Sequence, residues 1–378
     1  MIVQSLRSRP EKPTSSTIRV GVIGAGFGAA VHIPALQQIA GVKVVAVCAR
    51  RAERAHLAAA QHGVPAAVSD YRELTADTEI DAIVVASPPY LHHSMTIAAL
   101  EAGKHVLCEK PMARSLAEAR DMVKIAERAG VTAMINHEFR FLPARARAKE
   151  LIDGGYLGEP QTASLTIYRA SLNDPHGIPF GWLMQQDKAG GMLGAAGSHH
   201  IDSLRWWFGE VKSVAGAVGT MVKRRRLPES QQMATVDADD NFAPLLKFVS
   251  GAIATIHYSA TAAYDLTDQI VLSGSEGMLM LTSEGLLYGA KRREPMTEQE
   301  LPGHVLGAPP SFDHPLIQPT TALSREWIAA IREKRQASPS FADGIKVQEI
   351  LDGVVRSSQQ GRWVDVGRGR FGPGSGSA

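Results

Sequence analysis

Lys110 is the residue whose type and position most clearly suggest chemistry, and it lies in the tripeptide Glu109-Lys110-Pro111. It directly follows the apolar run 105–108, which predicts a strand. A side chain at the carboxyl end of a parallel strand points into the crevice where such sheets bind ligands. An ammonium group there can stabilise the oxygen of a reacting alcohol or carbonyl group and share its proton. A surface lysine paired with Glu109 is the alternative, but Pro111 makes the turn rigid and favours the functional interpretation.

A second group of candidate residues follows the glycines Gly190 and Gly191, in the stretch Gly197-Ser198-His199-His200-Ile201-Asp202. On a helix, His199 and Asp202 are three residues apart and share a face. His199 is therefore a candidate acid or base, since imidazole titrates near neutrality. A capped helix start with a structural His–Asp bond is the alternative. We expect no metal here, because the sequence offers no second cluster of ligands.

The apolar run 18–23 and the glycine-rich turn after it predict a dinucleotide site. Gly24 permits the tight turn, Gly26 lets the backbone approach a pyrophosphate, and Ala29 allows close packing of helix and strand. The amides at the start of the following helix then face the phosphates. A glycine-rich turn without a ligand is the alternative.

The end of the second predicted strand bears on the choice of cofactor. A site that prefers NAD usually carries Asp or Glu here, whereas this chain has Ala49 followed by Arg50 and Arg51. A guanidinium group can pair with the 2′-phosphate of NADP, so we expect NADP to be preferred over NAD. The alternative is that the two arginines begin a solvated helix.

These residues must be positioned by two different kinds of domain. Alternating strands and helices over residues 18–137 predict a doubly wound parallel sheet of the Rossmann type. Residues 138–366 predict an α+β domain with a large, mostly antiparallel sheet that holds the substrate. The segments 1–17 and 367–378 are expected to be disordered tails. The expected strands are 18–23, 42–48, 82–86, 105–108, 132–135, 165–168, 245–249, 253–258, 270–272 and 278–281, and the expected helices are 28–40, 51–62, 92–102, 115–129, 143–153, 197–208, 321–335 and 342–358.

Composition excludes several classes of partner. The chain has 378 residues and a formal net charge of only +2, so neither nucleic acid nor a membrane surface is expected as the main partner. The basic run 223–226 is expected to be a solvated loop. Cys48 and Cys108 both end apolar runs and are expected to be buried free thiols, which fits a reducing, cytoplasmic compartment. No run approaches the roughly 18 apolar residues of a membrane span.

The order and spacing of several motifs resemble the Gfo/Idh/MocA oxidoreductases, a family that includes glucose–fructose oxidoreductase and inositol dehydrogenase. The likeness extends from about residue 18 to residue 366. The motifs that carry it are Gly24-Ala25-Gly26, His32-Ile33-Pro34-Ala35-Leu36, Ser87-Pro88-Pro89-Tyr90-Leu91-His92, 99–106 with Glu109-Lys110-Pro111, Gly190-Gly191, Gly197-Ser198-His199, Asp202, and Gly274-Ser275-Glu276-Gly277.

The resemblance implies a site between the two domains, with the nicotinamide near Lys110 and the substrate held by the second domain. It also implies a homodimer or homotetramer formed through the second sheet. Lys110 and His199 are the implied catalytic residues. The expected cofactor-binding residues are Gly24, Gly26, Phe27, Gly28, Ala29, Arg50, Arg51, Ser87, Pro88, His92, Glu109 and Lys110, and the expected substrate-binding residues are Arg140, Trp182, His199 and Asp202.

Some of these residues have structural alternatives. Arg140 follows the last parallel strand, where Asn136, His137 and Glu138 are further candidates for lining the pocket; Arg140 could equally form an ion pair. Trp182 could belong to the core, and His92 could be purely structural.

One position departs from the family pattern. Many catalytic members have an aspartate four residues before the histidine, and this chain has Ala195 there. Either His199 works with Lys110 alone, or the substrate differs from a polyhydroxylated sugar, or the protein has lost turnover. Lys110, His199 and the resemblance together lead us to expect an NAD(P)-dependent oxidoreductase that interconverts a secondary alcohol and a ketone, on a sugar or cyclitol. A dehydrogenase of a less polar, ring-bearing alcohol and a cofactor-binding regulatory protein without turnover are the alternatives.

Overall fold

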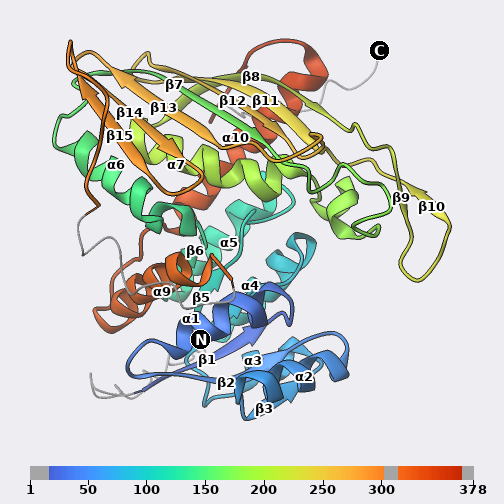
Figure 1. Cartoon of the computed structure of the whole chain (residues 1–378). Coiled ribbons are helices and arrows are strands. Elements are labelled where there is room, and N and C mark those ends of the chain that lie inside the picture. Colours follow the sequence, from blue (N-terminus) through green and yellow to red (C-terminus); the bar gives the residue numbers. More distant parts are fainter. Residues whose placement is uncertain (1–16, 302–313, 368–378) are drawn as a thin grey trace, which may run out of the picture.

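The computed structural model of the chain describes residues 17–301 and 314–367. Its N-terminal part, blue to teal in Figure 1, is a six-stranded parallel sheet with the order β3-β2-β1-β4-β5-β6. This order is that of a dinucleotide-binding Rossmann fold, which confirms the expected fold class. The strands are β1 Ile18–Ile23, β2 Val42–Cys48, β3 Ala66–Val68, β4 Ala82–Val85, β5 His105–Cys108 and β6 Ala133–Ile135.

Helices cover both faces of this sheet, because its strands are apolar on both sides. Val20 and Val22 of β1 pack in one buried cluster, and Ile83 and Val85 of β4 pack in another. The elements between the strands are η1 Gly28–His32, α1 Ile33–Gln37, α2 Ala52–His62, α3 Tyr71–Ala76, η2 Pro89–Leu91, α4 His92–Glu101 and α5 Leu116–Ala129.

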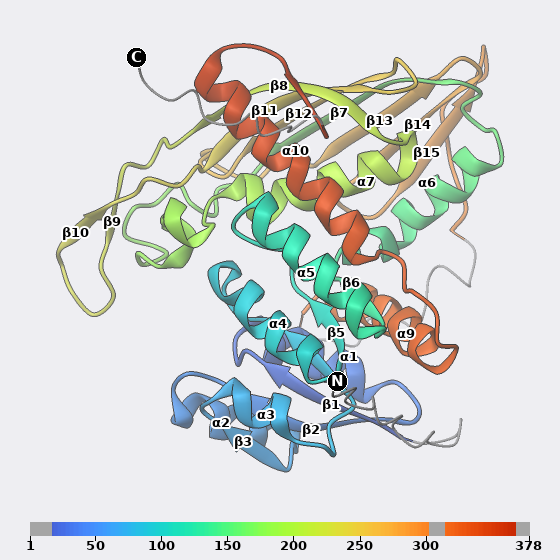
Figure 2. The same ribbon diagram turned by 180° about the vertical axis from the view of Figure 1, so that it is seen from behind.

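One helix of this domain comes from the far end of the chain. Helix α9, Ile317–Arg332, follows the second sheet in sequence, yet its Leu323, Trp327 and Ile328 lie in the same buried cluster as β1. Figures 1 and 2 show α9 beside the parallel sheet. A division of the chain at residue 137 therefore separates α9 from the core in which it packs.

The second sheet has nine strands in the order β16-β15-β14-β13-β7-β12-β11-β8-β17. Most neighbours are antiparallel, as expected, but β12 and β7 pair in parallel. The strands are β7 Pro160–Tyr168, β8 Val211–Gly219, β11 Asn241–Phe248, β12 Ile253–Ser259, β13 Gln269–Gly274, β14 Gly277–Thr282, β15 Leu287–Lys291, β16 Thr297–Glu298 and β17 Val364–Asp365.

The helices of the second domain lie between its sheet and the Rossmann domain, as Figures 1 and 2 show for α6, α7 and α10. They pack on one face of the sheet and so bring α7 towards the carboxyl ends of the parallel strands. The helical elements are η3 Glu138–Phe141, α6 Pro143–Asp153, η4 Trp182–Met184, η5 Gln186–Lys188, η6 Leu193–Gly197, α7 Ser198–Phe208 and α10 Phe341–Gln360.

Several local expectations need correction. The strands β3, β8 and β15 and the helix α3 were not expected from the sequence, since their runs are short or contain glycine and alanine. The basic run is not a solvated loop, because Arg224–Arg226 forms β9, which pairs with β10, Met233–Thr235. Arg225 is buried and donates to the carbonyl oxygen of Asp174 at 2.9 Å.

The expected tails lie outside the described residues, apart from Thr17 and Gly367. None of the helices within 17–301 and 314–367 has the length and apolar composition needed to span a bilayer.

Candidate active site

The turn after β1 is shaped to accept a ligand against its backbone. Gly24 has φ of +126°, and a Cβ atom there would lie 2.2 Å from the carbonyl oxygen of Ala86, so only glycine fits. A Cβ atom on Gly26 would meet no atom within 4 Å. Gly26 is thus not required by the packing of the protein itself. In dinucleotide-binding folds the pyrophosphate lies against this glycine, and here the space beside it is open. The residues present fit a dinucleotide.

The helix after this turn begins with a single π-helical turn, η1, and continues as α1. Gly28 packs closely against the sheet, because a Cβ atom there would lie 2.9 Å from Val22 Cγ1. Ala29 is buried too, so two residues rather than Ala29 alone bring the helix close to the strands. Phe27 lies edge-on to the ring of His32, with 5.6 Å between centroids.

His92 connects two loops at the carboxyl edge of the sheet. Its Nε2 lies 2.8 Å from the carbonyl oxygen of Ser87, and its Nδ1 lies 3.0 Å from that of Pro111. The buried ring therefore ties the Ser87-Pro88 loop to the turn that carries Lys110. Because both ring nitrogens face backbone carbonyls, His92 shapes the expected cofactor site rather than offering a free polar atom to it.

Glu109 is buried beneath the same edge. Its Oε1 accepts a 2.6 Å hydrogen bond from Asn136 Nδ2 and lies 2.7 Å from Nε2 of His32. Burial alone would raise the pKa of Glu109, but the bond with His32 and the nearby ammonium of Lys110 hold that pKa below its usual value. His32 was not among the predicted site residues, and only the long-range contact reveals its role.

Arg50 and Arg51 are exposed at the end of β2, beside the expected position of the adenosine ribose. Arg51 precedes the first turn of α2, so both their predicted role and the alternative of a solvated helix start are compatible with this placement.

Lys110 reaches across to the second domain. Its Nζ donates a 2.7 Å hydrogen bond to the backbone carbonyl oxygen of Ala195, which lies in the π-helical turn η6 before α7. Ala195, which stands where many family members have an aspartate, thus contacts Lys110 through its main chain. Lys110 is only partly buried, so its ammonium group remains available to a ligand.

His199 lies in the first turn of α7 and is buried. Its ring stacks on Phe139, with 3.9 Å between centroids and 9° between planes, and its Nε2 lies 3.5 Å from Oε1 of Glu138. Burial and the positive charge of Lys110 hold the pKa of His199 well below its ordinary value. The imidazole is therefore neutral at pH 7 and can accept or pass on a proton.

Arg140 and Asp202 pair with each other. Arg140 Nε donates to Oδ2 of Asp202 at 2.7 Å, and its Nη2 donates to Oδ1 at 2.6 Å. A further bond of 3.1 Å joins Arg140 to Asp343 of α10, the carboxyl whose pKa lies near 2 because Arg140 offsets the effect of its burial. This is the ion-pair alternative for Arg140, and a substrate-binding role for either partner stays a prediction.

Buried polar atoms without hydrogen-bond partners gather around Lys110 and His199. They belong to three consecutive residues that follow β6. The atoms are Oδ1 of Asn136, both ring nitrogens of His137 and both carboxylate oxygens of Glu138. Burial lowers the pKa of His137 to about 4. Such atoms cost free energy when they are left unsatisfied, so this cluster offers hydrogen-bonding sites to ordered water or to a polar ligand.

Trp182 lies apart from this cluster. It is half-buried in η4, and among the described residues its side chain has no hydrogen bond or ring contact with Lys110 or His199. Its predicted contact with substrate remains untested.

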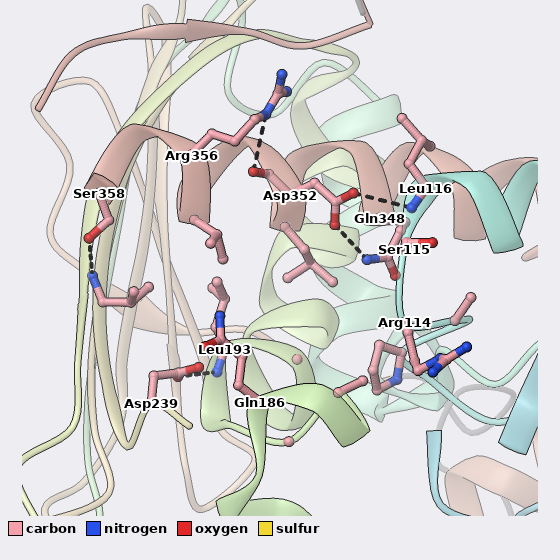
Figure 3. Close-up of a pocket in the computed structure, with 18 of the residues that line it drawn as sticks. Arg114, Ser115, Leu116, Gln186, Leu193, Asp239, Gln348, Asp352, Arg356 and Ser358 are labelled. Atoms are coloured by element: carbon pink, nitrogen blue, oxygen red, sulfur yellow. Dashed lines mark hydrogen bonds between the residues drawn. The ribbon is translucent and has the colours of Figure 1, made fainter. Parts of the chain in front are cut away.

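A cavity of about 1050 Å³ borders the site, and Figure 3 shows its walls. Pro111 and Leu193 line it, but Lys110 and His199 do not. Several of its polar groups already bond to each other: Asp239 accepts from the backbone of Leu193 at 2.7 Å, and Asp352 accepts from Gln348 at 2.8 Å. The cavity therefore lies beside Lys110 and His199 rather than around them.

No group of three or more His, Cys, Asp or Glu side chains within residues 17–301 and 314–367 could hold a metal ion.

Comparisons with known proteins agree with this geometry. The Gfo/Idh/MocA model described as an oxidoreductase family with an NAD-binding Rossmann fold matches residues 18–137, and the model of the family's C-terminal alpha/beta domain matches residues 149–366. Levoglucosan dehydrogenase from Pseudarthrobacter phenanthrenivorans is 30% identical, covering 92% of this chain and 98% of its own. Inositol 2-dehydrogenase from Rhizobium meliloti is 26% identical, covering 93% of this chain and 99% of its own.

A solved structure of a family relative has the same fold. Levoglucosan dehydrogenase in complex with NADH and levoglucosan superposes with a TM-score of 0.86 at 28% identity, covering 93% of this chain and all of the other. The fold, the matched residues and the shared motifs lead to one conclusion: this chain belongs to the Gfo/Idh/MocA family of oxidoreductases.

Proposed function

We propose that the protein is an NAD(P)-dependent dehydrogenase that interconverts a secondary alcohol and a ketone on a sugar or cyclitol. The observation that carries this proposal is the buried cluster around Lys110 and His199, whose unsatisfied oxygen and nitrogen atoms suit the hydroxyl groups of a polyol. They suit a less polar alcohol poorly. The relatives named as dehydrogenases of levoglucosan and inositol support the same substrate class.

The chain's own residues divide the work. When bound, a nicotinamide cofactor supplies the group that accepts or returns a hydride. Gly24 and Gly26 hold the dinucleotide against the backbone, and Glu109 with His92 fixes the turn that presents Lys110. Lys110 stabilises the substrate oxygen with its charge, and His199 takes or gives the hydroxyl proton as a neutral base or its conjugate acid.

We propose NADP(H) as the preferred cofactor, with NAD(H) as the alternative. The exposed guanidinium groups of Arg50 and Arg51 and the absence of an acidic side chain at Ala49 support this preference. Relatives of known structure contain NADH, which keeps the alternative open.

Two further features of the proposal concern its setting. We place the protein in the cytoplasm, because Cys48 and Cys108 are buried free thiols. We also propose a homodimer or homotetramer that pairs through the face of the second sheet turned away from α7 and α10, on which Ile253 and Met278 are exposed.

The test is a fluorescence titration with NADPH and NADH, followed by turnover assays with four compounds. Levoglucosan, D-apiose and inositol are in the names of related dehydrogenases, and L-sorbose is bound in a solved structure of levoglucosan dehydrogenase. We expect binding of NADPH and formation or loss of reduced cofactor with at least one of these compounds. Binding of neither cofactor would contradict the proposal, and binding without turnover on the whole panel would favour a protein that has lost catalysis.

A further inference from the structure

The starting point is the missing carboxylate at position 195. Ala195 offers His199 no acidic partner, and its backbone carbonyl already accepts the bond from Lys110 Nζ. Neither neighbour, Gly194 or Ala196, carries a carboxyl group. A histidine that moves a proton works best with a group that can receive it or orient the ring, so another residue must fill this role if the site turns over.

Glu138 lies where such a group is needed. It begins η3, separated from the end of β6 by Asn136 and His137, and is fully buried. Its carboxylate accepts no hydrogen bond from another described side chain, and its Oε1 lies 3.5 Å from Nε2 of His199. The stacking of His199 on Phe139, the next residue, fixes the ring relative to this carboxyl.

Charged groups approach Glu138 from β5, α6 and α7. Glu109 and Lys110 face it from the end of β5, Asp202 faces it from α7, and Arg145 of α6 lies over the Phe139 ring. Burial and the charge of Glu109 raise the pKa of Glu138 to about 8, although Lys110 acts in the opposite direction.

The other two helices add little charge of their own. On α9, which also packs against η3, Glu326 pairs with Arg335, Arg332 bonds to Ala40, and Arg325 is exposed. On α10, Asp343 is paired with Arg140. The carboxyl of Glu138 is thus poised to hold or release a proton near neutral pH.

We propose that Glu138 supplies the carboxyl function that Ala195 lacks, as the proton partner of His199. This inference rests on the proposed function, since it assigns a role in the same alcohol–ketone interconversion. In this role Glu138 is a positioning residue that acts through His199 rather than on the substrate carbon.

The proton balance follows from the geometry. In the direction of oxidation the carbinol carbon loses a hydride to the cofactor, and the hydroxyl proton passes to one ring nitrogen of His199. The other nitrogen, Nε2, which faces Glu138, gives its own proton to Oε1 of ionised Glu138. The neutral acid then releases this proton to water. In reduction the proton moves the opposite way, from neutral Glu138 through His199 to the substrate oxygen.

The first test compares the wild type with Glu138→Gln, which keeps the shape of the side chain but cannot carry a proton. Oxidation by the wild type should rise with pH to a plateau above about 8, and reduction should fall over the same range. In Glu138→Gln this step should vanish and kcat should fall about a hundredfold, while the affinity for NADPH or NADH is unchanged. Glu138→Asp should keep the pH step.

The second test does not depend on turnover. Infrared difference spectra of wild type minus Glu138→Gln should show a protonated carboxylic acid at pH 7 that is lost as the pH rises through about 8. Asp239, whose pKa is raised to about 6 by burial, cancels in this difference. A spectrum without the acid band would overturn the inference.

The outcomes separate the two proposals. Wild-type turnover together with a Glu138→Gln rate within about threefold and an intact pH step would overturn the proton partnership alone. No turnover by the wild type on any compound would overturn the proposed function, and the infrared result would still decide the state of Glu138.

Discussion

The glycine turn after β1 and the buried polar cluster around Lys110 and His199 are built on opposite principles. The turn uses backbone: Gly24 and Gly26 are adjacent in sequence to the strand and helix that they connect, and their role is to have no side chain. The cluster uses side chains from segments far apart in the chain, namely Glu109 and Lys110, Glu138, and His199. One region is made by local geometry and the other by tertiary packing.

The difference also appears in the cost of each region. At Gly26 the space is open, so the turn buries no polar side chain that would need a hydrogen-bond partner before a ligand binds. The cluster instead buries groups whose charged forms are unfavourable, so the pKa of Glu138 rises and those of His137 and His199 fall. Function at the turn is compatible with stability, whereas function in the cluster requires buried polar atoms that weaken the fold.

The largest expected effect concerns the buried ion pair of Arg140 and Asp202, which lies beside the polar cluster. Arg140→Met leaves Asp202 buried without its bidentate partner and should lower the free energy of unfolding by about 3–5 kcal/mol. Chemical denaturation measures this. Arg114→Met is the matched control, because its pair with Glu118 is exposed and should be worth no more than about 1 kcal/mol. Equal losses in the two variants would contradict a special role for the buried pair.

The next effect concerns pH and stability. Glu138 is protonated in the folded protein below about pH 8, whereas it ionises near its ordinary value in the unfolded chain. The unfolded state therefore binds fewer protons between these two values. The free energy of unfolding should fall by up to about 1.4 kcal/mol per unit as the pH rises from about 5 towards 8, and the fall should level off above that.

Glu138→Gln should remove this component of the slope, and the exposed Glu101→Gln should leave it unchanged. Denaturation curves at several pH values provide the measurement. The same slope in all three proteins would show that Glu138 is ionised in the fold.

At the cofactor turn, a smaller effect separates binding from folding. Gly26→Ala places a methyl group in open space, so stability should hardly change while affinity for the dinucleotide falls by about tenfold, or about 1.4 kcal/mol. Gly24→Ala should instead destabilise the protein, since its Cβ would clash with Ala86. Thermal unfolding and cofactor titration of both variants test the contrast, which fails if Gly26→Ala binds as well as the wild type.

The smallest effect concerns cofactor choice. Replacing Arg50 and Arg51 by alanine should weaken NADPH relative to NADH by about fivefold, because exposed charge pairs are weak and screened. Parallel titrations at low and high salt give the ratio. A ratio that does not respond to the double substitution would assign these arginines to the solvated start of α2.

The same contrast explains what could be predicted from the sequence. The parallel sheet follows from local pattern and is confirmed. The glycine turn and Lys110 follow β1 and β5 in the same way, and their roles stay predictions. The bond of His32 with Glu109 and the stacking of Phe139 on His199 join distant segments, so no periodicity could reveal them. The return of α9 to the first sheet is hidden for the same reason.

The most direct test of the account is turnover by Lys110→Ala beside wild type, with cofactor affinity measured on the same preparations. Lys110 donates a hydrogen bond to the carbonyl oxygen of Ala195 in the second domain, and we expect its removal to reduce turnover at least about a hundredfold, with a smaller loss of cofactor affinity. Lys124→Ala, on the exposed face of α5, should behave like the wild type. Turnover by Lys110→Ala equal to that of the wild type would contradict the assignment of proton chemistry to this cluster.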